Sequence, residues 1–198
     1  VGIATWRAVP DTTANNFATL NGTSIPSKYT VSNGNLTFTN STTNWTGWLE
    51  GTVGFSTGKY YWETRIDVST DYHHIGIVGV GITHFNTTDA YRYGVSYQSD
   101  GRYWAENNNF NAFQVGITQS KTVGDIVMLA VDMSSKKMWI GKNGTWFSGD
   151  PATGSSAPFD STRGFNYTHY VPFYDSYGSS GLTINFGQNP TFSGNTTA

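Results

Sequence analysis

The chain has few carboxylates, and one pair of them has a spacing that could serve sugar hydrolysis. Glu63 and Asp67 are four positions apart in KYYWETRIDV, so a strand would place both on one face. Glycoside hydrolases hold two carboxyl groups roughly 5–10 Å apart around the bond that they cleave. Arg65 would share that face, as in an ordinary surface row of charges. We therefore expect no catalytic residues, and a polysaccharide-acting enzyme is kept as an alternative.

The histidines do not have the spacing of a metal site. Neither H-x-H nor H-x-x-x-H occurs, and His73 and His74 would point to opposite faces of a strand. Cysteine is absent, so disulfides and thiolate metal sites are excluded. We expect no metal and no cofactor, and we expect His73 and His74 to be loop residues stacked on Tyr72.

The composition excludes some classes of partner. Charged residues make up 12% of the chain, its net charge is −2, and its Lys and Arg residues are scattered, which argues against nucleic acid. The longest apolar segment, Ile75–Ile82, is far shorter than a membrane span, so no membrane insertion is expected. Because the chain starts at Val1, we expect it to be processed or cut from a longer polypeptide. The neutral, amide-rich composition suits a secreted or particle-bound protein.

The alternation of side chains indicates antiparallel strands, and no window shows the period of a helix. Apolar and polar residues alternate along Lys59–Val68 and Leu182–Phe186. Ile75–Ile82 and Ile126–Val131 are apolar on both faces, as expected for central strands that are covered on both sides. The pattern predicts an all-β sandwich.

Asn143 and Gly144 lie between two short aromatic segments, and the pair also begins an N-glycosylation sequon. Both residue types accept positive φ, as a two-residue hairpin turn requires. Asp125–Met133 and Lys137–Gly141 are predicted as the preceding pair of strands. The turn explains Asn143 without a sugar.

Five motifs, in this order along the chain, resemble those of the SPRY domain. The first, GKYYWE, resembles the G-x-x-Y-W-E signature that opens the domain. The matching segments are Gly58–Glu63, Gly79–Gly81, Gly124–Asp132, Trp139–Gly144, and Val171–Phe173 with Asn185–Gly187, Pro190 and Phe192.

The segment before GKYYWE resembles the lead-in on SPRY domains of bacteriophage structural proteins. The similar stretches are Phe17–Asn21, Tyr29–Thr37 and Gly51–Gly54. The resemblance divides the chain into lead-in strands packed on the sandwich (1–57), a SPRY-like domain (58–192) and a frayed tail (193–198), within one structural domain.

The SPRY resemblance implies a concanavalin-like β-sandwich of two antiparallel sheets, without catalytic residues or a cofactor. It also implies that loops at one edge of the sandwich hold a partner. Carried over by position, the expected ligand-binding residues are Tyr72, His73, His74, Tyr91, Arg92, Tyr93, Asp175, Ser176 and Tyr177. These loops are richer in Tyr and His than those of peptide-binding SPRY domains, so the ligand itself does not carry over.

We predict a non-catalytic binding module on a virus particle, with a virion or extracellular location. The first hypothesis is host-surface attachment by a tail fibre or receptor-binding protein, whose partner is a protein or glycan receptor. The alternative is a capsid decoration or assembly protein that contacts neighbouring virion proteins. Assembly as a homo-oligomer within a larger particle fits either role.

Overall fold

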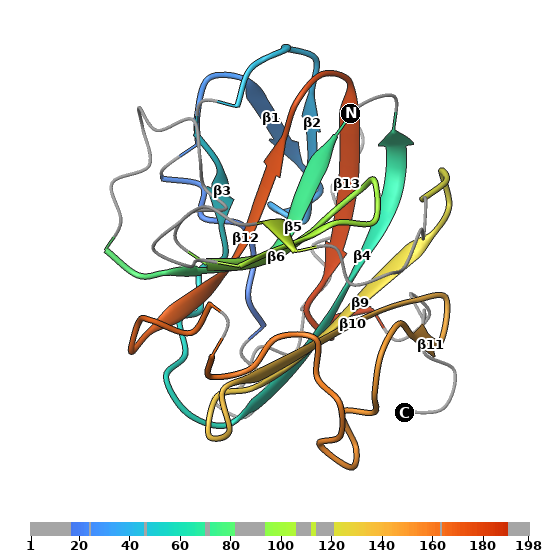
Figure 1. Cartoon of the computed structure of the whole chain (residues 1–198). Helices are drawn as coiled ribbons and strands as arrows, with labels where there is room; N and C mark the ends of the chain where they lie inside the picture. The colour runs from blue at the N-terminus through green and yellow to red at the C-terminus, as the bar shows by residue number, and fades with distance from the viewer. Residues whose placement is uncertain are drawn as a thin grey trace.

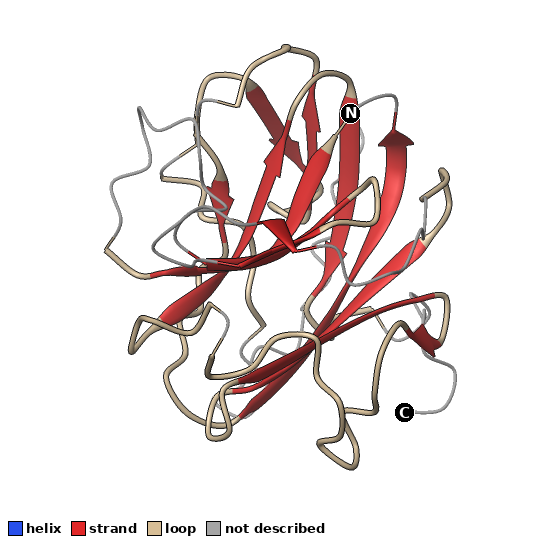
Figure 2. Cartoon of the chain, viewed as in Figure 1, coloured by secondary structure: helices blue, strands red, loops and turns tan. Residues whose placement is uncertain are grey.

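The computed structural model describes residues 17–23, 25–45, 47–69, 72–81, 94–105, 112–113, 121–162 and 164–189. Throughout these residues the regular structure is β-strand, and two antiparallel sheets pack against each other (Figures 1 and 2). No helix long and apolar enough to cross a membrane is found in them. The expected all-β sandwich is confirmed. The frayed tail predicted for 193–198 lies outside the described residues.

One sheet has seven strands and contains the GKYYWE segment. Its order is β1 (Tyr29–Ser32), β2 (Thr37–Asn40), β13 (Ser180–Asn185), β4 (Lys59–Ser69), β9 (Ile126–Asp132), β10 (Lys137–Lys142) and β11 (Thr145–Trp146). The alternation in β4 places Trp62, Thr64 and Ile66 in the interior, each at most 2% exposed.

The other sheet has six strands. Its order is β3 (Leu49–Glu50), β12 (Tyr170–Ser176), β5 (His73–Gly79), β6 (Gly94–Gln98), β7 (Tyr103–Ala105) and β8 (Ala112–Phe113). Every residue of β5 and β12 is buried, as expected for adjacent interior strands of a sheet that is covered on both faces.

The lead-in strands belong to both sheets. The β1–β2 hairpin adds to the seven-stranded sheet through pairing of β2 with β13, and β3 adds to the six-stranded sheet through pairing with β12. Asn33, Gly34 and Asn35 have φ values of 53°, 61° and 63°, so residue types that accept positive φ form the four-residue turn between β1 and β2.

The strand predicted for Ile75–Ile82 begins earlier and ends earlier than expected. It starts at His73, because His73 and His74 continue the pairing with Ser176 and Asp175 of β12. It ends at Gly79, and Val80 and Gly81 form a turn in which Gly81 has a φ of 89°. The prediction of His73 and His74 as loop residues is therefore wrong.

The Asn143-Gly144 turn between β10 and β11 is confirmed. The two residues have φ values of 49° and 83°, and Lys142 pairs with Thr145 on either side of them. The Asn143 side chain also holds the start of β9, because its Oδ1 accepts from the Ile126 N–H at 2.8 Å and its Nδ2 donates to Asp125 Oδ1 at 2.7 Å. The turn residue thus joins β9 to the β10–β11 hairpin.

We predict that Asn143→Ala costs about 2–4 kcal/mol of unfolding free energy, since it loses both hydrogen bonds and strains a left-handed backbone. Asn143→Gly keeps the backbone conformation and is expected to cost less. Asn33→Ala is the matched control, because Asn33 has a φ of 53° in an exposed turn. Urea denaturation of the three variants measures these differences. An Asn143→Ala loss no larger than that of Asn33→Ala would contradict the role given to the side chain.

Candidate functional site

The residues predicted to bind a ligand do not all lie in loops. His73 and His74 are in β5 and Asp175 and Ser176 are in β12, and all four are buried. Their expected place in exposed edge loops is wrong, because strand pairing extends to the end of both strands. Their side chains are at most 1% exposed, so in this structure they support a surface rather than form it.

Two of the expected contact residues are at the surface. Tyr72 precedes β5 and is 47% exposed, and Tyr177 follows β12 and is partly exposed. A hydrogen bond of 2.8 Å from the Tyr177 N–H to the Tyr72 carbonyl oxygen holds the two segments together. The predicted residues Tyr91, Arg92 and Tyr93 lie outside the described residues.

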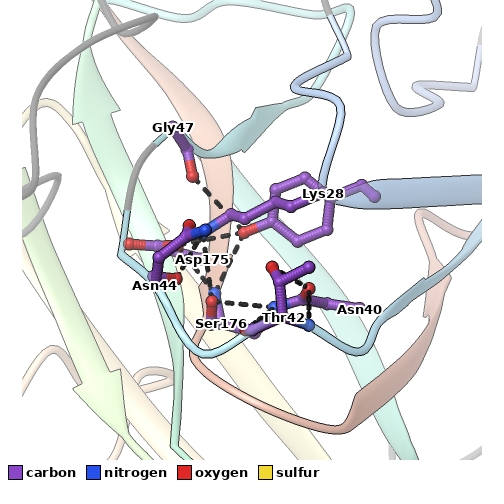
Figure 3. Close-up of polar contacts among 8 residues, drawn as sticks. Lys28, Asn40, Thr42, Asn44, Gly47, Asp175 and Ser176 are labelled. Atoms are coloured by element: carbon purple, nitrogen blue, oxygen red, sulfur yellow. Dashed lines mark hydrogen bonds and ion pairs between the residues drawn. The ribbon is translucent and has the colours of Figure 1, made fainter.

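Beneath this end of the sandwich lies a buried ion pair that joins the lead-in to β12 (Figure 3). Lys28 Nζ is 2.9 Å from Asp175 Oδ1, and the two side chains are 4% and 1% exposed. The ammonium also donates to the carbonyl oxygens of Ser176 at 3.0 Å and Asn44 at 3.2 Å. All three of its donors therefore have acceptors.

The ion pair is costly to bury. Burial raises the pKa of Asp175 to about 6, although Lys28 and the Tyr29 hydroxyl, which donates to Oδ1 at 3.0 Å, both oppose the rise. Burial also lowers the pKa of Lys28, against the attraction of Asp175. Asp175 Oδ2 is buried and accepts no hydrogen bond from the described residues. Desolvation thus outweighs the attraction, as is common for buried pairs.

Asn40 holds the segment between β2 and β3 against the end of β12. Its Nδ2 donates to the Ser176 hydroxyl at 3.0 Å and to the Ser176 carbonyl oxygen at 3.1 Å. Its Oδ1 accepts from the backbone N–H and the hydroxyl of Thr42, both at 2.9 Å. Figure 3 shows these contacts beside the ion pair. The Ser176 N–H also donates to the Tyr29 hydroxyl at 3.0 Å, so three residues of the lead-in, Lys28, Tyr29 and Asn40, hold Ser176.

His73 and His74 have separate polar partners. Lys121 Nζ lies 2.6 Å from His73 Nδ1, and His74 Nδ1 lies 3.0 Å from the Ser96 hydroxyl. Burial holds the pKa of His73 well below its usual value and lowers that of His74 to about 3, and the Lys121 charge adds to both shifts. Both imidazoles are therefore neutral at pH 7.

Four neighbouring rings, including that of His74, form what we call the aromatic cluster, which consists of Trp45, His74, Trp104 and Tyr177. The Trp45 ring lies 5.2 Å from His74 and 5.4 Å from Tyr177, and His74 lies 5.9 Å from Trp104. Trp104 donates through Nε1 to Gln98 Oε1 at 2.6 Å. The partly exposed rings of Trp45, Trp104 and Tyr177 thus rest on a hydrogen-bonded support.

The positions of the described residues give little support to the alternatives of metal binding and sugar hydrolysis. Over the part of the chain that the structure describes, no group of three or more His, Asp or Glu side chains could hold a metal ion. Glu63 and Asp67 are four residues apart in one strand, so their Cα atoms are separated by about 13 Å. Asp67 is held by Arg65, whose Nε lies 2.6 Å from Asp67 Oδ1. Glu63 is 4% exposed and accepts from the Tyr61 hydroxyl at 2.6 Å.

The sequence reasoning missed several residues of this site. Lys28, Asn40 and Trp45 come from the lead-in, more than a hundred residues before Asp175. A lone Trp within the polar stretch STTNWTG was a usable signal, since an aromatic among short polar residues is a candidate contact residue. Lys28 and Asn40 gave no signal, because their importance depends on distant partners.

Solved structures with a similar fold are SPRY domains. The SPRY domain of human HERC1 aligns with a TM-score of 0.57 and 21% identity, over 83% of this chain and 98% of that chain. The TRIM65 PSpry domain aligns with a TM-score of 0.57 and 13% identity, over 85% of this chain and 91% of that chain. No protein-family model and no curated protein matches the chain by sequence. The SPRY resemblance is therefore confirmed for the fold.

We predict that Lys28→Met costs about 3–5 kcal/mol at pH 7, because it leaves the Asp175 carboxylate buried without its cation. Asp175→Asn should cost a similar amount, and the double variant should lose less than the sum of the two. Lys59→Met is the control: Lys59 is exposed and 3.9 Å from Asp132, so its loss should stay below about 1 kcal/mol. Denaturant titration of all four variants gives the coupling energy. Strict additivity of the two single losses would contradict the proposed pair.

We predict that acidification below about pH 6.5 destabilises the domain. The unfolded chain protonates His73 and His74 there while the folded chain does not, so stability is lost as pH falls towards 3. Asp175 acts in the opposite direction between about pH 6 and 4, because its raised pKa lets the folded state take up a proton first. In that range the two histidines oppose one carboxyl, so the free energy of unfolding falls by about 1.4 kcal/mol for each pH unit of acidification.

Urea midpoints between pH 7.5 and 4.5 test this balance. His74→Gln should reduce the dependence on pH, while His169→Gln, at an exposed position, should leave it unchanged. A stability that rises on acidification would show that Asp175 dominates.

Proposed function

We propose that the chain is a non-catalytic binding module that recognises its partner through the aromatic cluster and Tyr72. The observation that carries this proposal is the pair of partly exposed rings, Trp45 and Tyr177, held over buried polar groups at the end of β5 and β12. Large aromatic rings of restricted mobility make strong contact residues, since little entropy is lost when they bind. The SPRY-like fold supports the proposal, because that resemblance implies recognition at one edge of the sandwich.

The partner proposed for this surface is a host-surface receptor, with the chain exposed on a virus particle. The resemblance of the lead-in to that of bacteriophage structural proteins supports this placement. The low fraction of charged residues, 12%, also fits a particle surface that contacts proteins or glycans by aromatic and amide groups.

Retention of the purified chain on two baits, candidate host cells and assembled virus particles, tests the proposal. Retention on cells is expected, and Trp45→Ala or Tyr177→Ala should weaken it at least about tenfold, as for central contact residues of an interface. Val80→Ala is the matched control, because Val80 is 51% exposed in the turn at the other end of β5.

The outcomes separate the alternatives. Retention only on particles would favour a decoration or assembly role over attachment. Retention that survives both aromatic substitutions would place recognition elsewhere on the chain. Each variant is first compared with the unmodified chain by circular dichroism, so that loss of folding is not taken for loss of binding.

A further inference from the structure

A concave surface lies on the outer face of the seven-stranded sheet, and we call it the outer groove. Its volume is about 440 Å³, within the range of roughly 300–1,000 Å³ typical of small-molecule sites. Strands β4, β9 and β10 form its floor, and β11 and the segment after it form one wall. Its lining residues include Lys59, Tyr61, Ala130, Asp132, Trp146 and Asp150.

The strand register explains why the groove forms here. Tyr61, Ala130 and Trp139 are direct neighbours across β4, β9 and β10, so a small side chain lies between two large rings. Gly141 pairs with Trp146, and a Cβ at Gly141 would lie only 3.0 Å from Trp146 Cε3. The absence of a side chain at Gly141 therefore lets the Trp146 ring lie close against β10.

The rings of the groove are fixed and accessible. Tyr61 is 40% exposed, and its hydroxyl is held by Glu63 at 2.6 Å. Trp146 is partly exposed and meets Tyr61 edge to face, with ring centroids 6.3 Å apart. Trp139 is buried, and its Nε1 donates to the Ser155 carbonyl oxygen at 2.9 Å, which anchors the wall.

The rim of the groove carries acceptors of fixed orientation. Asp132 Oδ1 accepts from the N–H groups of Ser134 at 2.9 Å and Ser135 at 3.2 Å, and Asp150 Oδ1 accepts from the Ala152 N–H at 2.8 Å. The second oxygen of Asp132 is 3.9 Å from Lys59 Nζ, too far for a direct hydrogen bond. Carboxylates that are already oriented by the backbone bind a ligand with little loss of entropy.

We propose that the outer groove binds a neutral saccharide. A sugar ring presents an apolar C–H face that packs on an aromatic ring, and hydroxyl groups at its edge that both donate and accept. The rim offers acceptors in Asp132 and Asp150 and a donor in Lys59, which suits such groups. A cationic ligand would meet Lys59 and an anionic one would meet the two carboxylates, so the mixed rim favours a ligand without charge.

A smaller hollow lies beside the outer groove. It has a volume of about 150 Å³ and shares Tyr60 and Tyr61 with the groove. Its other lining residues include Phe55, Pro172 and Phe186, of which Phe55 belongs to the core, so the proposal rests on the outer groove alone. This site is on the sheet opposite to the aromatic cluster and does not depend on the function proposed above.

Titration of the ¹⁵N-labelled chain with short oligosaccharides, followed by NMR, tests the proposal. The probes are neutral oligomers of glucose, xylose, mannose and galactose, with oligogalacturonate and oligolysine as charged comparisons. We expect at least one neutral oligomer to shift the amide signals of Tyr61, Ala130 and Trp146. Trp146→Ala should weaken that binding at least about tenfold, while Val80→Ala, in the exposed turn after β5, should leave it unchanged.

Several outcomes would overturn the proposal: no shift with any neutral oligomer, shifts confined to other surfaces, or stronger binding of a charged probe at the same residues. If Trp146→Ala does not fold, Asp132→Asn and Asp150→Asn take its place, because asparagine keeps the oxygen that the turns require. Each should weaken binding at least about threefold, and unchanged binding in both would reject the role of the rim.

Discussion

Lys28 contacts the carboxylate of Asp175 near the end of β12, 147 residues further along the chain, and the end of the sandwich is organised around that contact. Both charges are removed from water, so each requires the other as a partner. The lead-in must therefore be positioned accurately against the end of β12. Tyr29, Asn40 and Ser176 complete the enclosure. Trp45 and Tyr177 directly follow Asn44 and Ser176, whose carbonyl oxygens accept hydrogen bonds from Lys28. The position of the proposed recognition surface therefore depends on a pair that is costly to bury.

The desolvation cost also explains why this end of the molecule carries so many polar side chains. An ammonium and a carboxylate without enough partners would be replaced by apolar residues or would neutralise by a pKa shift. Here the three donors of Lys28 are satisfied, while Asp175 retains a raised pKa. The histidines nearby stay neutral because burial, together with the charge of Lys121, disfavours their protonated forms.

What the sequence predicts, and what it does not, follows from the range of the interactions. The strands and the Asn143-Gly144 turn depend on neighbouring residues, through alternation and positive φ, and they were predicted within a few residues. His73, His74, Asp175 and Ser176 were assigned to loops by position, through the resemblance to the SPRY domain. Their burial depends on Lys28, Ser96 and Lys121, and no local pattern identifies partners so distant in sequence.

The outer groove and the aromatic cluster also differ in the sequence separation of the segments that form them. Apart from Lys59, Tyr60 and Tyr61 of β4, the outer groove is built from β9, β10 and β11 and the segment after it. These strands follow one another in sequence and are joined by short turns, so Trp139 and Trp146 are positioned by local pairing. The aromatic cluster takes its rings from the lead-in, β5, β7 and the end of β12, and long-range polar contacts hold those segments together. Acidification charges the histidines of the unfolded chain and so lowers the stability of the whole domain. The shape of the cluster therefore depends on the folding of distant segments, while the groove is preorganised mainly by the hairpins that form it.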